Sequence, residues 1–288
     1  MADVKFKWVR SVYGSGDDAM KKYTYIHDGP MNLVLKDWHD KQPERELRCS
    51  PSGLTTCPRV VWLKMHGVEP TNVMGWGTKQ RMMLGRQFED LFASQLRDEG
   101  KLLYHWKDNP GDKVEKFSMG EGDEHCEGVP DYLLRLGDTT YISDAKTSRS
   151  DSFGYVPISP PEIWEDGGWF KYKVQLTAYL MLCEANSDWF DKQELPMPTK
   201  CHLFSYALDD GIVRREVEWT PTSEDKANVV KYIKRFNQAM KAGKCPACTC
   251  PDSPNGFDVK FCPYSVKEEG SKVGTSCCSD ELIDKVKG

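Results

Sequence analysis

The chain has 288 residues, of which 39% are hydrophobic and 29% charged, and its formal net charge is −5. This length supports a sizeable core in one large domain, with or without a small appendage. The negative charge argues against a protein that coats nucleic acid non-specifically, although it leaves room for a locally basic groove. The first ten residues, MADVKFKWVR, lack the apolar core of a signal peptide, and no apolar run approaches a membrane span. We therefore expect no membrane contact and a cytosolic location, in a bacterium or a virus-infected cell.

Eleven cysteines occur in this chain. Without an export signal they predict metal or cluster ligation better than a disulfide scaffold.

The first 49 residues are polar and irregular apart from one short predicted helix over 31–39, and we expect an N-terminal extension without chemistry there. From Ser50 the pattern changes, because residues 60–63 have helical apolar spacing and Gly67 can end a helix. Cys57 lies at the head of this helix. A single cysteine at such a position is as often a small buried residue as a ligand.

Residues 74–99 form the longest predicted helix. Its apolar stripe consists of Met82, Met83, Phe88, Leu91, Phe92 and Leu96. Glu89 borders this stripe, where a glutamate is more often a boundary residue than a ligand. Residues 101–127 then predict a strand, followed by a loop rich in Gly, Asp and Glu that ends at Cys126.

Residues 128–147 predict a β-hairpin, because apolar runs flank Gly137-Asp138 and a glycine in the first loop position suits a type II′ turn. If Leu136 faces Thr139, then Asp131 lies opposite Asp144, with Cβ atoms roughly 5 Å apart. Like charges at this separation repel unless a cation lies between them. Alternation places Lys146 on the same face as Asp144. This grouping suits metal-assisted phosphodiester hydrolysis; the alternative is the solvated face of an ordinary hairpin.

A connection rich in Ser, Pro and Gly over 149–168 leads to a predicted helix over 169–184. Lys171, Gln175 and Tyr179 recur along one face of that helix, either as functional groups or as a polar boundary stripe. Aromatic residues near the helix start are as often core anchors as platforms for bases. These aromatic residues are Trp164, Trp169, Phe170 and Tyr172.

Residues 200–207 and 212–219 predict a second hairpin, and residues 222–241 a helix opened by Thr220-Pro221. The basic residues of this helix are Lys231, Lys234 and Arg235, and we favour a solvated face over a basic track for them.

The tail KCPACTCPDSPNGFDVKFC contains clustered cysteines, which indicate Zn²⁺ or an iron–sulfur cluster. These cysteines are Cys245, Cys248, Cys250 and Cys262.

Three sequence motifs together resemble one known group of enzymes. PD at 130–131 with DAK at 144–146 resembles the motif of the PD-(D/E)XK nuclease superfamily. QLTAY at 175–179 resembles the QxxxY motif of its RecB-like exonuclease branch, and GRQFE at 85–89 resembles that branch's first motif, with Glu in place of His. The resemblance covers about residues 50–265 and implies an α/β restriction-endonuclease-like core, in which the Glu89 and Gln175 helices flank a central mixed sheet.

The resemblance also implies roles for individual residues. The ligands of one or two Mg²⁺ or Mn²⁺ ions would be three carboxylates and a main-chain carbonyl, from Glu89, Asp131, Asp144 and Ala145. Lys146 would position or polarise the attacking water and offset charge on the phosphate. Gln175 and Tyr179 would orient the DNA strand, because an amide and a phenol can hydrogen-bond phosphate without competing for metal.

The cysteines resemble those of the iron–sulfur branch of RecB-like nucleases, which includes the CRISPR-adaptation exonucleases and has phage-borne relatives. This resemblance implies a [4Fe–4S] cluster that ties the N-terminal and C-terminal segments together. Its implied ligands are Cys57, Cys248, Cys250 and Cys262, with Cys245, Cys277 and Cys278 in reserve. The tail spacing departs from the usual C-x₂-C-x₅-C ending, and a self-contained Cys₄ zinc site is the alternative.

We therefore expect a nuclease domain over 50–265 and a short tail over 266–288. The expected function is metal-dependent DNA exonuclease activity at free or single-stranded ends, in recombination, repair or replication. A recombination or replication protein is an expected partner. The basic lining that captures such ends would include Lys146, Arg149, Lys171 and Lys173. Two alternatives remain: a structure-specific endonuclease of the same superfamily, and a non-catalytic iron–sulfur or zinc protein that binds nucleic acid on a degenerate nuclease scaffold.

Overall fold

The computed structural model describes residues 47–72, 76–105, 116–148, 167–207, 212–249, 262–265 and 283. Contacts divide the chain into two units, Met1–Arg45 and Glu46–Gly288, and all described residues lie in the second unit. The predicted helix over 31–39 lies outside the described residues, as do Arg149, Trp164, Cys250, Cys277 and Cys278.

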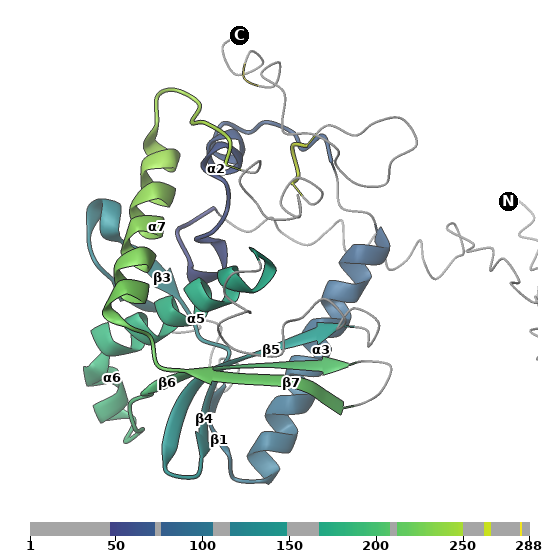
Figure 1. Cartoon of the computed structure of the whole chain (residues 1–288), viewed down its shortest axis with the longest axis vertical. Helices are drawn as coiled ribbons and strands as arrows, with labels where there is room; N and C mark the ends of the chain where they lie inside the picture. The colour runs from purple at the N-terminus through teal and green to yellow at the C-terminus, as the bar shows by residue number, and fades with distance from the viewer. Residues whose placement is uncertain are drawn as a thin grey trace, which may run out of the picture. The chain divides into compact units, whose positions relative to one another are not determined.

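A five-stranded mixed sheet forms the centre of the fold, as predicted (Figure 1). Its order is β1 (Leu102–His105), β4 (Tyr132–Leu136), β5 (Thr139–Ser148), β6 (Lys200–Ala207) and β7 (Ile212–Trp219). Neighbouring strands are antiparallel except for β5 and β6, which are parallel. A parallel pair needs a crossover connection, and α5 (Gly167–Ala185) lies within the one that joins these two strands. A separate two-stranded sheet consists of β2 (Phe117–Met119) and β3 (Cys126–Gly128).

The predicted hairpin is present, with Leu136 opposite Thr139 and Tyr132 opposite Ser143. Gly137 has φ of 61°, as the first position of a type II′ turn requires. The strands differ slightly from the predicted runs, since β4 begins at Tyr132 and β5 continues to Ser148. The next position beyond the Tyr132–Ser143 pair brings Asp131 opposite Asp144, which confirms the predicted register.

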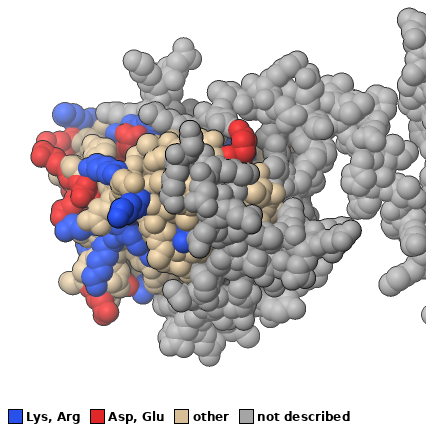
Figure 2. Space-filling model, turned by 90° about the horizontal axis from the view of Figure 1, so that it is seen from above, with Lys and Arg blue, Asp and Glu red and all other residues tan. Residues whose placement is uncertain are grey.

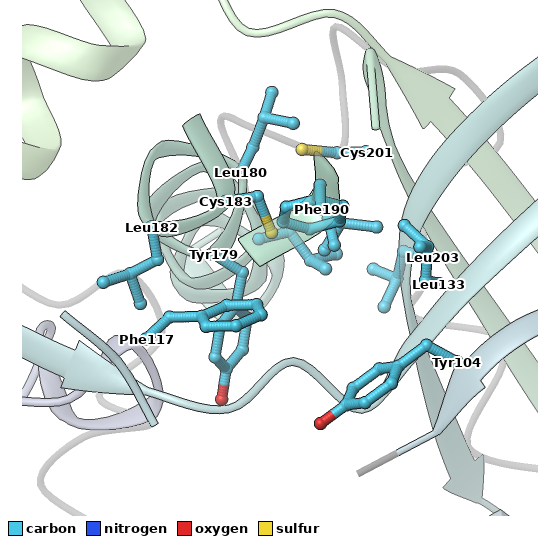
Figure 3. Packing of buried hydrophobic residues seen from close by; sticks show 12 residues of the cluster. Tyr104, Phe117, Leu133, Tyr179, Leu180, Leu182, Cys183, Phe190, Cys201 and Leu203 are labelled. Atoms are coloured by element: carbon cyan, nitrogen blue, oxygen red, sulfur yellow. The ribbon is translucent and has the colours of Figure 1, made fainter. Parts of the chain in front are cut away.

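Helix α5 covers one face of the sheet (Figure 1). Its buried residues Leu176, Tyr179 and Leu180 pack in one apolar cluster with Leu133, Ile142 and Leu203 of the sheet (Figure 3). The short helix α6 (Ser187–Lys192) follows and places Phe190 in the same cluster. The Tyr179 side chain is thus buried among apolar residues.

Helix α3 (Trp76–Asp98) packs on the opposite face. There Phe92 and Ala93 contact a cluster that includes Tyr132, Ala145 and Phe204. Successive strand residues point to opposite faces, so Ile142 lies under α5 and Ala145 under α3. The two predicted helices therefore flank the sheet on its two sides.

Helix α7 (Ser223–Lys241) packs beyond α5, and α2 (Pro58–Met65) packs against α7 (Figure 1). Thr222 caps α7 through a capping box with Asp225, at 3.1 Å from the Asp225 amide to Thr222 Oγ1 and 2.9 Å from the Thr222 amide to Asp225 Oδ2. Short 3₁₀ turns occur at Pro51–Gly53, termed η1, and at Gly122–Glu124, termed η3.

The basic residues of α7 form a solvated face. Lys234 pairs with Glu124 at 2.7 Å, and Arg235 stacks over Tyr232 at 4.5 Å. Lys226 pairs with Glu184 at 2.6 Å. Figure 2 shows acidic and basic side chains interspersed on the described part of one face of the molecule.

Candidate active site

Asp131 and Asp144 form the centre of the candidate site. Asp131 immediately precedes β4, and Asp144 lies in the middle of β5. Burial raises the pKa of Asp131 well above its ordinary value, and the negative charge of Asp144 raises it further. The folded chain therefore holds these two carboxyls close together at an electrostatic cost.

Asp144 is only 1% exposed, and its two oxygens have different surroundings. Oδ2 accepts a hydrogen bond from Gln175 Nε2 at 3.2 Å and pairs with Lys146 Nζ at 2.5 Å. Oδ1 is buried and accepts no hydrogen bond from an N–H or hydroxyl donor among the described residues, and the Asp131 carboxyl lies within hydrogen-bond reach of Asp144. A buried carboxylate oxygen without such a donor is costly, so this atom marks a place that a cation would stabilise.

Lys146 lies two residues after Asp144 on the same strand face, as the alternation predicts. Burial by itself would lower the pKa of Lys146, but the charge of Asp144 outweighs burial and raises the pKa above its ordinary value. The ammonium also lies 4.9 Å from the centre of the Tyr172 ring, and Lys171 Nζ lies 5.2 Å from the same centre. Lys146 is therefore a cation beside the carboxylates at neutral pH.

Glu89 approaches this centre from α3. Burial raises its pKa, and the charge of Asp144 raises it further, which places the two carboxylates within electrostatic reach. Gly85 lies one turn earlier on α3. The Cβ of any other residue at this position would come within 3.1 Å of Thr147 Oγ1 on β5. The glycine of the predicted GRQFE motif thus allows α3 to approach the strand that carries Asp144.

The three carboxylates lie near one another without converging on one point. Among the residues that the structure describes, no three His, Cys, Asp or Glu side chains are arranged to hold a metal ion. Lys146 instead supplies the positive charge next to Asp144.

Gln175 and Tyr179 both face the carboxylates from α5, as their predicted spacing requires. Burial raises the pKa of Tyr179 well above its ordinary value, and the charges of Asp131 and Asp144 raise it further. In Figure 3 the Tyr179 hydroxyl points out of the apolar cluster. Tyr179 therefore presents a protonated phenol to the site at pH 7.

Two features of this site were not predicted from the sequence. Tyr132 donates a hydrogen bond from its hydroxyl to the main-chain carbonyl of Glu89, at 2.8 Å. Gly128 lies against η1 and α5, where a built Cβ would come within 2.7 Å of Pro51 Cδ and 3.1 Å of Tyr179 Cε1. The strand alternation already placed Tyr132 on the face opposite Asp131, and it could have suggested the contact between Tyr132 and α3. No local pattern indicated the close approach at Gly128.

The described cysteines fall into two groups. Cys57 and Cys262 are buried in one apolar cluster, with Cys245 and Cys248 packed against it. Cys57 Sγ lies 3.8 Å from Cys248 Sγ and accepts a hydrogen bond from the Thr249 amide at 3.4 Å. The chain thus brings the head of α2 to the tail cysteines, as expected.

The remaining described cysteines are core residues: Cys49, Cys126, Cys183 and Cys201. Burial raises the pKa of Cys183 and Cys201, which keeps these thiols protonated and inert. The number of cysteines in the sequence therefore overstates the number of candidate metal ligands.

Lys173, which was predicted to belong to a basic lining for DNA ends, forms an ion pair between two helices instead. Lys173 Nζ pairs with Asp225 Oδ1 at the start of α7, at 2.6 Å. Lys146 and Lys171 remain beside Tyr172.

Comparisons with known proteins identify no family for this chain. No family model matches it, and no curated protein matches it. A solved structure titled "Crystal structure of SSO0001" is similar over 74% of this chain and 87% of that chain, with 20% sequence identity and a TM-score of 0.40. A likeness of this size identifies neither a family nor a function. No helix among the described residues is long and apolar enough to cross a membrane.

Proposed function

We propose that this protein is a metal-dependent deoxyribonuclease of the PD-(D/E)XK type, a RecB-like exonuclease that hydrolyses DNA from free ends. The observation that supports it most is the buried Oδ1 of Asp144, which accepts from no N–H or hydroxyl donor among the described residues. This oxygen lies in a group that also contains the carboxyls of Asp131 and Glu89, whose pKa values are both raised. Such a group is short of positive charge, and a divalent cation would supply it.

The chemistry of these residues suits a hard divalent cation, although the described side chains are not arranged around one point. Carboxylate oxygens of Glu89, Asp131 and Asp144 are the donors that Mg²⁺ and Mn²⁺ prefer, and the Ala145 carbonyl completes the proposed set. When bound, such an ion lowers the pKa of a coordinated water and offsets negative charge on the scissile phosphate.

The chain's own groups account for the rest of the proposed chemistry. Lys146 would neutralise charge that develops on the phosphate, because it stays protonated beside Asp144. Gln175 would orient Asp144 by donating to its Oδ2. Tyr179 would donate to a phosphate oxygen, since its phenol stays protonated.

The cysteines suit a second, structural role in the same proposal. We propose that Cys57, Cys248, Cys250 and Cys262 bind a [4Fe–4S] cluster, with structural Zn²⁺ as the alternative. Cysteine side chains of two segments far apart in the chain already lie in contact at Cys57 and Cys248. The proposal places the protein in the cytosol, where such thiols stay reduced, with DNA and a recombination or replication protein as partners.

Two other functions would use parts of the same structure. A structure-specific endonuclease would use the same catalytic residues on DNA without ends. A non-catalytic iron–sulfur or zinc protein would bind nucleic acid without the carboxylates. The group of Glu89, Asp131, Asp144 and Lys146 favours an enzyme, because carboxyls with raised pKa values beside a lysine cluster at functional sites.

Cleavage of end-labelled linear DNA with Mn²⁺ tests the proposal. We expect Asp144→Asn and Lys146→Ala each to lower the rate by about a hundredfold or more, because each removes a charge next to the phosphate. Lys226→Ala is the matched control, since it removes a lysine that pairs with Glu184 on the surface. Wild-type rates in folded Asp144→Asn protein would refute the proposal.

A further inference from the structure

Tyr172 lies one turn before Gln175 on the face of α5 that looks toward the candidate site. It precedes Gln175 by three residues and Tyr179 by seven, and this spacing places the three side chains along one face of a helix. The Tyr172 side chain is partly buried and packs against the apolar cluster between α5 and the sheet. This packing restricts the position of its aromatic ring.

Two ammonium groups lie against this ring. Lys146 Nζ is 4.9 Å from the centre of the Tyr172 ring, and Lys171 Nζ is 5.2 Å from the same centre. Both distances are within the roughly 6 Å at which the negative face of an aromatic ring attracts a cation. Because Lys146 belongs to β5 and Lys171 to α5, the ring joins basic side chains of the sheet and of the helix that covers it.

An aromatic ring holds an ammonium without neutralising its charge. Asp144 Oδ2 also contacts Lys146 Nζ, at 2.5 Å, but a carboxylate partner offsets the charge of the lysine. The face of a ring has no net charge, so a lysine that contacts it can still attract an anion. Two like charges near one ring also repel each other, and an anion beside both would relieve this repulsion. The Lys146 side chain is 28% exposed, which leaves it accessible to such an anion.

We propose that Tyr172 is a positioning residue, whose ring holds the ammoniums of Lys146 and Lys171 where both contact phosphates of one DNA strand. This inference rests on the proposed function, because it requires that DNA is the ligand. It needs no metal ion, since lysines attract phosphates by charge alone. Tyr172 acts through the two lysines and contacts no phosphate itself. Lys173, which pairs with Asp225, lies outside this subsite.

Binding of a fluorescently labelled single-stranded oligonucleotide tests this role, when anisotropy is measured at several salt concentrations in a chelating buffer. Each phosphate contact on a single strand contributes about 0.7 to the slope of log K against log salt. We expect Lys171→Ala to reduce the size of this slope by about 0.7, and Tyr172→Leu by about 1.4 because it releases both ammoniums. Tyr172→Phe keeps the ring and should keep the wild-type slope.

Tyr232→Leu is the matched control. Tyr232 is also a partly buried ring on a helix with a cation over it, since Arg235 of α7 lies 4.5 Å from the ring centre. We expect this variant to bind the oligonucleotide with the affinity and the slope of the wild type, because it leaves Lys146 and Lys171 in place.

Several results would overturn the role of Tyr172. A weaker affinity of Tyr172→Leu with an unchanged slope would show that the ring stacks on a base instead. A wild-type slope in Lys171→Ala, a reduced slope in Tyr172→Phe, an unfolded Tyr172→Leu protein, or no binding by the wild-type protein would also overturn it. The proposed function survives each of these results if the wild-type protein cleaves linear DNA with Mn²⁺, whereas absence of that cleavage would overturn the proposed function itself.

Discussion

The repulsion between Asp131 and Asp144 links stability to function at the scale of single residues. The raised pKa of Asp131 means that its ionisation is less favourable in the folded state than in the unfolded state. Its contribution is therefore destabilising above the ordinary carboxyl pKa of 3.8, and the penalty grows as the pH rises from that value to the folded pKa, above which it is constant. Below that ordinary value both states are protonated and the penalty disappears.

We predict that Asp131→Asn stabilises the metal-free protein at about pH 7 by about 1 kcal/mol, or a few degrees in melting temperature, while it abolishes Mn²⁺ binding. The stabilisation should vanish at about pH 3.5, where Asp131 is neutral in the wild type as well. Thermal unfolding followed at both pH values in a chelating buffer measures the effect. Asp123→Asn is the control of opposite sign, because a hydrogen bond from Lys241 lowers the pKa of Asp123. A destabilised Asp131→Asn protein at neutral pH would contradict the prediction.

At the scale of elements, the site depends on close approach between segments that are distant in the chain. η1 packs against β3 and α5 at Gly128, where Pro51 and Tyr179 leave no space for a side chain. The Pro51 ring is rigid, so it cannot rotate away as a flexible side chain would. The position of Tyr179 therefore depends on a segment that contributes no functional group.

We predict that Gly128→Ala destabilises the protein by about 1–3 kcal/mol, because the added methyl group forces Pro51 or Tyr179 to move. Displacement of Tyr179 should also slow cleavage relative to the wild type at a temperature where both proteins are folded. Denaturant unfolding and the cleavage assay measure these two effects. Gly243→Ala is the matched control, since a built Cβ there meets no atom within 4 Å. Equal stability of the two alanine variants would show that the approach at Gly128 is not tight.

At the scale of the whole molecule, the cysteine contact closes the chain on itself. Cys57 and Cys248 are 191 residues apart in sequence, and the segment between them contains the hairpin and both flanking helices. A metal cluster at this contact would constrain the unfolded chain strongly, since a long closed loop loses much of its conformational entropy.

We predict that anaerobically purified protein is brown and contains about four iron atoms per chain. Cys57→Ser should lose this iron and lower the melting temperature, whereas Cys183→Ala, which changes a buried core cysteine, should keep the iron. Metal analysis and visible absorption measure both outcomes. Colourless protein with zinc and no iron would instead assign a structural zinc site.

We also predict that cleavage requires a free DNA end. A chain tied together on both sides of the hairpin would enclose the site, and an enclosed passage admits a threaded strand more readily than an uninterrupted duplex. The net charge of −5 agrees, since weak non-specific attraction suits capture of ends through a local basic lining. Covalently closed circular single strands should therefore persist while linear strands of the same sequence are degraded. Equal rates on both would indicate an endonuclease with an open cleft.

Much of the fold and part of the candidate site follow from local patterns in the sequence. The turn at Gly137 sets the register of the hairpin, and that register brings Asp131 opposite Asp144 without reference to the rest of the chain. Helical periodicity likewise places Gln175 and Tyr179 on one face of α5. These features could be predicted because strand and helix geometry repeats at fixed spacing.

Contacts between elements could be decided only by the tertiary structure. It shows which oxygen of Asp144 accepts no N–H or hydroxyl hydrogen bond within the described part of the chain, that Tyr132 donates to the carbonyl of Glu89, and that Lys173 pairs with Asp225. Each contact depends on how a helix is placed on the sheet or on another helix. Burial and packing over many residues determine that placement, so no short pattern in the sequence specifies it.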